Sequence, residues 1–281
     1  MEKSDKVSGI SIKDINIENE PFARGGFGEV YMAKWRKVNV VVKVINASTE
    51  EEKQAVKCEA NITCRLDHPN VIKLFGTTHV NHKRPAIVME KAEHRSLDTW
   101  VGKIDHEKLT KIALGITDGL EYVHSKKVIH RDIKPKNILM FGPVNDMIPK
   151  IADFGVAKLI QTYTVHTKVG EELYMAPEVR LNLPYSFTAD IFSLAMMLFE
   201  MFNEQLLSHA SEEVSRYILQ VHSGETSAIP KKCKVPQYLR KVVEGGLNRD
   251  ACRRPTLSTY RLTLNGKYLL LLNTLCMTQP K

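Results

Sequence analysis

The sequence predicts an α+β fold with a small, strand-rich N-terminal part and a larger, mainly helical C-terminal part. From Ile10 to about Glu90, short β-branched and apolar runs alternate with turn residues. Beyond Leu97, apolar residues recur at helical spacing instead. The chain of 281 residues is long enough for one large domain or two ordinary ones, and it contains no internal repeat or low-complexity linker.

The N-terminal part is predicted to hold several strands and one helix. Asp14–Glu20 leads into a glycine-rich turn, and Val38–Ile45 is rich in β-branched residues, as suits a buried strand. The run Ser48-Thr49-Glu50-Glu51-Glu52 offers a capping box for a helix that extends to about Leu66. Further strands are expected at Val71–Gly76 and Ala86–Glu90.

Two helices are indicated in the C-terminal part. Thr188–Phe202 is apolar on nearly all sides, which predicts a helix buried in the core. The most apolar runs, Ile191–Phe202 and Tyr268–Met277, are too short to span a bilayer, so no transmembrane segment is expected. The second predicted helix, which comes earlier in the sequence than Thr188–Phe202, carries an apolar stripe made of Leu109, Ile112, Ile116, Leu120 and Val123.

The charge and the cysteines limit the partners and the compartment. The net charge of +8 is spread along the chain, which favours an ordinary solvated surface and leaves attraction to acidic substrates or anionic lipid as the alternative. No aromatic-basic module supports nucleic-acid binding. The N-terminal run MEKSDKVSG lacks the apolar stretch of a signal peptide. Five scattered cysteines without a CxxC pair predict neither disulfides nor a zinc site, so a cytoplasmic location is expected.

Two short runs carry the chemistry. HRDIKPKNIL, from His130 to Leu139, is followed by Asp153-Phe154-Gly155. Asp132 can accept a hydroxyl proton, and Lys134 can neutralise charge on a moving phosphoryl group. Asn137 and Asp153 can hold hard cations through oxygen. These groups are suited to moving a phosphoryl group from a magnesium-bound nucleotide to a hydroxyl.

The two runs resemble the catalytic-loop and metal-loop signatures of protein kinases. The resemblance covers roughly Ile12 to Arg261 and implies a bilobal protein-kinase fold, with ATP and Mg²⁺ as cofactors. Lys134 is typical of serine/threonine kinases, and the lead-in SIKDINI resembles the tyrosine-kinase-like group. The implied divisions are an N-terminal extension at 1–11, a kinase domain at 12–275 (N-lobe about 12–90, hinge about 90–95, C-lobe about 96–275) and a tail at 276–281.

The run FARGGFGEV resembles the glycine-rich loop that covers ATP phosphates in this family. Glycine lets backbone N–H groups approach phosphate oxygens closely, although a glycine-rich hairpin by itself is a common turn. The family has glycine where this chain has Ala23. The nucleotide contacts implied in this loop are Phe22, Ala23, Arg24, Gly25, Gly26, Phe27, Gly28 and Val30.

Other implied nucleotide contacts lie on the strands and the hinge. Lys43 matches the strand lysine that reaches the phosphates, and Glu59 matches its partner on the helix; swinging that helix breaks the pair and switches activity. Taken singly, each would be an ordinary exposed charge. Val41 replaces the family's alanine and would narrow the adenine site. Met89 is expected behind the adenine. The base is expected to contact the backbone of Glu90 and Ala92. Leu139 is the last of the implied nucleotide contacts.

The second half carries groups that would control activity. Glu178 of Ala176-Pro177-Glu178 is expected to pair with Arg254. His130 and Phe154, with Thr63 and Leu74, are expected to stack in a column on Asp190, with Thr63 smaller than the usual side chain. Phosphorylation is expected at Thr167, with Arg131 receiving the phosphate, unless the hydroxyls of Thr162, Tyr163, Thr164 and Thr167 are ordinary loop groups.

The resemblance implies a Mg²⁺- and ATP-dependent serine/threonine kinase that acts in intracellular signalling on proteins with Ser/Thr acceptors. Dimerisation or an adaptor could supply its regulation. A catalytically impaired pseudokinase is the alternative, because Ala23, Thr63 and Glu171 depart from the family pattern. Glu171 would repel Asp132 or capture Lys134. A small-molecule kinase is disfavoured by the full activation segment. The implied catalytic residues are Lys43, Glu59, Asp132, Lys134 and Asn137, and the implied metal ligands are Asn137 and Asp153.

Overall fold

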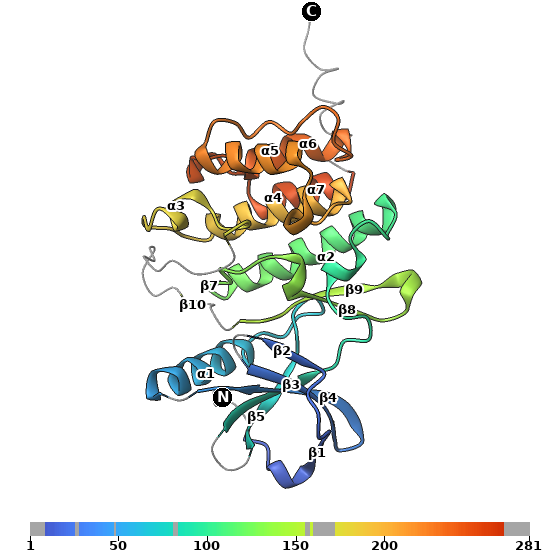
Figure 1. Cartoon of the computed structure of the whole chain (residues 1–281), viewed down its shortest axis with the longest axis vertical. Coiled ribbons are helices and arrows are strands. Elements are labelled where there is room, and N and C mark those ends of the chain that lie inside the picture. The colour runs from blue at the N-terminus through green and yellow to red at the C-terminus, as the bar shows by residue number, and fades with distance from the viewer. Residues whose placement is uncertain are drawn as a thin grey trace, which may run out of the picture.

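The computed structural model describes residues 9–25, 28–47, 49–80, 84–154, 158–159 and 172–266. A sheet with one helix forms one lobe, and a mainly helical part forms the other (Figure 1). The bilobal α+β fold expected from the sequence is therefore confirmed. Residues 160–171, which include Thr162, Tyr163, Thr164, Thr167 and Glu171, lie outside the described residues, as do Gly26 and Phe27.

The N-terminal lobe is built on an antiparallel six-stranded sheet. Its order is β1-β3-β4-β6-β5, with β2 paired to β3. β4 lies between β3 and β6, so its β-branched residues Val40, Val42 and Val44 are fully buried. The strands are β1 (Ile15–Ile17), β2 (Ala23–Gly25), β3 (Gly28–Trp35), β4 (Val38–Ile45), β5 (Leu74–Val80) and β6 (Arg84–Glu90).

The strand expected at Val71–Gly76 is wrong at its start, because β5 begins only at Leu74. The residues before it pair with β9 (Ile148–Ile151) of the other lobe. The Ile72 N–H donates to the Ile151 carbonyl at 2.9 Å, and Val71 bridges the same residue. The segment therefore joins the two lobes. Helix α1 (Glu50–Thr63) also ends before Leu66, in a turn.

The C-terminal lobe contains both predicted helices. All five apolar residues of the predicted stripe are buried on one face of α2 (His106–Ser125). The apolar helix α4 (Thr188–Asn203) is buried from Ala189 to Phe202. In the described part of the chain, no helix has the length and apolar character that crossing a bilayer requires. The remaining α-helices of the described residues are α3 (Pro177–Arg180), α5 (Glu212–Ser223), α6 (Gln237–Gly246) and α7 (Leu257–Leu264).

Two short strand pairs complete the described part of this lobe next to the sheet. β8 pairs with β9 in an antiparallel hairpin that lies between the N-terminal sheet and α2 (Figure 1). The other short strands pair with each other. Their bounds are β7 (Val128–Ile129), β8 (Ile138–Phe141) and β10 (Lys158–Leu159).

A buried ion pair joins α3 to the segment just before α7. Two guanidinium nitrogens of Arg254 lie 2.5 and 2.7 Å from the two carboxylate oxygens of Glu178. Arg254 also donates to the carbonyls of Thr188 and Asn248, at 2.9 Å each, and its guanidinium lies 5.2 Å from the centre of the Phe192 ring. The pair expected from the sequence forms, and each guanidinium nitrogen has at least one hydrogen-bond acceptor, as a buried charge requires.

His222 of α5 supplies a test of how this lobe responds to pH. Its Nε2 lies 3.2 Å from the Leu173 carbonyl oxygen, and its ring packs 5.8 Å from that of Phe192. Burial, assisted by the charge of Arg180, lowers the pKa of His222 to about 4. The unfolded chain therefore takes up this proton at a higher pH than the folded one. Stability from His222 is present above pH 6.5 and is lost as the pH falls toward 4.

We predict that lowering the pH from 7 to 5 costs the wild-type protein about 1 kcal/mol more folding free energy than His222→Gln, after allowing for partial exposure. Glutamine keeps a polar amide near the Leu173 carbonyl but does not titrate. Urea unfolding of both proteins at the two pH values measures the difference. An identical loss in the two proteins would show that His222 does not take up the proton on unfolding.

Candidate functional site

A cavity of about 580 Å³ lies between the two lobes. Its walls come from β2, β3, β4 and β6 on one side and from β8 and the segment after β9 on the other. Arg24 and Gly28 are not among the described residues that line it, although the sequence implied contacts for them. The predicted nucleotide contacts that do line it are Phe22, Ala23, Val30, Val41, Lys43, Met89, Glu90, Ala92 and Leu139.

Gly28 does not line the cavity, but the packing of β3 against β4 requires a glycine at this position. Its φ is +144°, and a Cβ there would lie 2.1 Å from the backbone oxygen of Val44. No other residue type fits between β3 and β4 at this point. Gly28 therefore shapes the turn by close backbone packing against β4.

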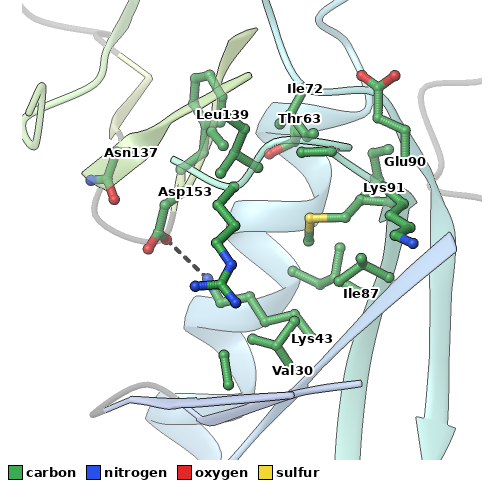
Figure 2. A pocket seen from close by; sticks show the side chains of 18 of the residues that line it. Val30, Lys43, Thr63, Ile72, Ile87, Glu90, Lys91, Asn137, Leu139 and Asp153 are labelled. Carbon is green, nitrogen blue, oxygen red and sulfur yellow. Dashed lines mark hydrogen bonds and ion pairs between the residues drawn. The ribbon is translucent and has the colours of Figure 1, made fainter. Parts of the chain in front are cut away.

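The Lys43 ammonium group lies between two carboxylates at one side of the cavity. Its Nζ is 3.1 Å from Glu59 Oε1 and 2.9 Å from Asp153 Oδ1. Figure 2 shows Asp153 facing Lys43, with Val30 and Ile87 beside the lysine stem. The side chains of Lys43 and Glu59 are only 13% and 9% exposed, so their charges depend on each other rather than on water.

The pKa values of this pair have clear physical causes. Burial by itself would lower the pKa of Lys43, but Glu59 and Asp153 together outweigh it and raise that pKa. Burial raises the pKa of Glu59; Lys43 opposes this shift, and Asp153 adds to it. Lys43 therefore stays protonated at neutral pH, as a group that binds phosphate oxygens must.

The catalytic-loop residues lie together beside the cavity. Asp132 Oδ2 accepts hydrogen bonds from Asn137 Nδ2 and pairs with Lys134 Nζ, both at 2.8 Å. Asn137 Nδ2 also donates to the Asp132 carbonyl at 2.8 Å. The Asn137 amide nitrogen donates to Asp132, and this orients the side-chain oxygen of Asn137, which is the atom that can bind a cation. The Ala152 N–H donates to the Asn137 carbonyl at 2.8 Å, which ties this loop to the segment of Asp153.

These residues fit a magnesium-bound nucleotide. Asn137 and Asp153 both line the cavity and offer oxygen ligands, which Mg²⁺ prefers. Apolar side chains of Val30, Val41 and Leu139 line the region that would hold a base. The ammonium of Lys43 supplies the charge that phosphate oxygens require.

Asp190, at the start of α4, holds the backbone of the catalytic loop. Its carboxylate accepts the N–H groups of His130 and Arg131, at 2.9 and 2.8 Å, and lies 2.8 Å from His124 Nε2. Burial would raise the pKa of Asp190, but the hydrogen bond and charge of His124 and the contacts of His130 lower it, so the group is ionised. Arg131 has a φ of +70°, a left-handed conformation that residues with a β-carbon usually avoid. The hydrogen bonds to Asp190 stabilise it.

His130 connects this loop to Phe154. The two rings lie 4.8 Å apart at 67°, and both side chains are fully buried. His130 Nε2 lies 3.1 Å from the Ala152 carbonyl, and Nδ1 accepts from the Asp132 N–H at 3.3 Å. Burial lowers the pKa of His130, consistent with a neutral ring that donates from Nε2. Thr63, expected in the same column, donates to the Glu59 carbonyl at 2.8 Å within its own helix.

Sequence reasoning missed how the hinge is fixed. The Glu90 carboxylate lies 2.7 and 2.8 Å from Lys150 Nζ and accepts the Lys73 N–H at 2.7 Å. Its own N–H donates to the Lys73 carbonyl at 3.1 Å, so this N–H is not available to a base. No spacing pattern signals a pair between residues 60 positions apart. The sequence also missed lining residues Met32, Ile72, Ile87, Lys91, Glu93, Arg95, Lys136 and Ala152.

We predict that Asp190→Asn lowers the free energy of unfolding by about 2–4 kcal/mol. An amide oxygen cannot replace both carboxylate oxygens, so one backbone N–H is left without its acceptor. Hydrogen exchange should also become faster at His130 and Arg131. Glu107→Gln, at an exposed position of α2, is the control and should change stability by less than about 0.5 kcal/mol. Unchanged exchange at the two amides would contradict this role of Asp190.

Comparisons with known proteins agree with this geometry. Residues 18–267 match the family described as "Protein kinase domain". The chain is 32% identical over 258 residues to mitogen-activated protein kinase kinase kinase 7 of Bos taurus and of Homo sapiens, over 88% of this chain and 43% and 41% of those proteins. It is 33% identical over 204 residues to serine/threonine-protein kinase pakE of Dictyostelium discoideum, over 70% of this chain and 22% of that protein. The chain thus spans less than half the length of these relatives.

Proposed function

Because the chain belongs to the protein kinase domain family, we propose that it is an ATP- and Mg²⁺-dependent protein serine/threonine kinase. One observation carries the proposal: Lys43, Glu59 and Asp153 meet at the wall of a cavity that Asn137 also lines. The similarity to mitogen-activated protein kinase kinase kinase 7 agrees with membership of the tyrosine-kinase-like group. We also propose residues 12–275 as the kinase domain, with the hinge at about 90–95.

In this proposal the nucleotide, bound with Mg²⁺, supplies the phosphoryl group. Asp132 orients the acceptor hydroxyl and takes its proton. Lys134, which pairs with Asp132, offsets negative charge next to that proton acceptor. Lys43 holds phosphate oxygens, and the oxygens of Asn137 and Asp153 hold the metal. The Glu90 carbonyl and the Ala92 backbone receive the base.

The substrates and the compartment belong to the same proposal. The acceptors are serine and threonine hydroxyls of proteins, because Lys134 accompanies Asp132 in the loop. A cytoplasmic location in intracellular signalling is supported by the thiols of Cys233 and Cys252, which form no disulfide among the residues that the structure describes. Thr167 is proposed as the regulatory phosphorylation site.

A pseudokinase that binds nucleotide without transferring phosphate is the second candidate. Two departures from the family pattern favour it: Ala23 lines the cavity, and Thr63 bonds within its own helix. The hydrogen-bonded group of Asp132, Lys134 and Asn137 favours an active enzyme instead. Transfer of phosphate therefore separates the two candidates.

We predict that the purified protein, with Mg²⁺ and γ-labelled ATP, phosphorylates itself or a generic basic protein on serine or threonine. Asp132→Asn should lower the rate at least about 100-fold, because the proton acceptor is lost, while ATP binding remains. The matched control, Asp105→Asn at the start of α2, should keep the wild-type rate. Nucleotide binding with no transfer by the wild-type protein would favour the pseudokinase.

A further inference from the structure

Arg95 is an unusual residue at the edge of the cavity. It follows the hinge, precedes the short helix Leu97–Trp100, and lines the same cavity as Lys43 and Asn137. Its φ of +59° lies in the left-handed region, which costs a residue with a β-carbon about 1 kcal/mol. Glycine would adopt this conformation without strain, so the presence of arginine indicates that its side chain has a role at the site.

The backbone around Arg95 is fixed by β8. The Met140 N–H donates to the Arg95 carbonyl at 2.9 Å, and the His94 N–H donates to the Met140 carbonyl at 3.1 Å. Ser96 bridges Leu139, the strand residue that also lines the cavity. The backbone of Arg95, and with it the point at which its side chain begins, is therefore fixed by pairing on both sides.

The charges around the cavity differ in how they are compensated. Lys43 pairs with Glu59 and Asp153, and the Glu90 carboxylate pairs with Lys150. Among the residues that the structure describes, the exposed Arg95 guanidinium has no hydrogen-bond or ion-pair partner. The cavity thus carries a cation whose donors remain available to a ligand.

We propose that Arg95 binds the phosphate groups of the nucleotide, together with Lys43, and so adds to the preference of this cavity for phosphorylated nucleotides over the bare nucleoside. The inference rests on the proposed function, since it assumes that a nucleotide occupies the cavity. A guanidinium presents paired N–H donors that match phosphate oxygens, and its charge is attracted by a triphosphate. The bare nucleoside offers no such anion, so Arg95 contributes nothing to its affinity.

Arg95 also lines a neighbouring groove with Thr99, Trp100 and Lys103. Lys103 lines the groove but not the nucleotide cavity, and its ammonium donates to the Thr99 carbonyl at 2.7 Å. Removing the charge of Lys103 therefore changes the groove while leaving the cavity wall intact. This makes Lys103→Gln a matched control for charge near Arg95.

The test measures the affinity of ATP and of adenosine, with Mg²⁺ present, by isothermal titration calorimetry. Arg95→Gln should weaken ATP binding about tenfold and leave adenosine binding within about twofold. Lys103→Gln should change neither. Arg95→Gly should weaken ATP binding as much as Arg95→Gln but raise the melting temperature, since glycine adopts this φ freely.

Three outcomes would overturn the inference. Equal ATP affinity in the wild-type protein and Arg95→Gln would show that Arg95 does not bind phosphate, while the proposed function would stand. Equal weakening of ATP and adenosine would show that Arg95 acts on the base, on the sugar or on folding. A wild-type protein that binds neither ligand would overturn both this inference and the proposed function.

Discussion

One ammonium group connects the parts of the molecule that form the site. Lys43 comes from the central strand β4, Glu59 from α1, and Asp153 from the segment that follows β9 in the other lobe. Burying the charges of Lys43 and Glu59 is costly, and it is offset because each carboxylate of Glu59 and Asp153 lies within 3.1 Å of the ammonium. The contact with Asp153 therefore links the two lobes at the wall of the cavity.

The second constraint is the buried carboxylate of Asp190. It holds two consecutive backbone N–H groups of the catalytic loop and so stabilises a left-handed residue, Arg131. Asp153 has a left-handed φ as well, of +64°. Strain of this kind is stored where side chains must be aimed at a ligand. The order of the loop therefore depends on α4, although no residue of α4 lines the cavity.

The parts of the fold that could be predicted from the sequence have local causes. The β-branched run of β4 and the apolar spacing of α2 and α4 each identify an element from its own residues. The motif residues Asp132, Asn137 and Asp153 could be assigned to one site because their types and order match a known pattern. The strand expected at Val71–Gly76 was wrong at its start because its residues pair with β9, a contact between lobes that no local pattern encodes. The Glu90–Lys150 pair has the same kind of non-local origin.

The most direct test of the central claim is the reactivity of individual lysines toward an amine-specific acetylating reagent, read by mass spectrometry. Lys43, buried between two carboxylates, should react at least about tenfold more slowly than exposed Lys111, and Mg²⁺ with ATP should slow it further. The rate at Lys111 should not respond to ATP. If Lys43 reacts as fast as Lys111 and ATP does not protect it, the three charged groups do not meet at one nucleotide site.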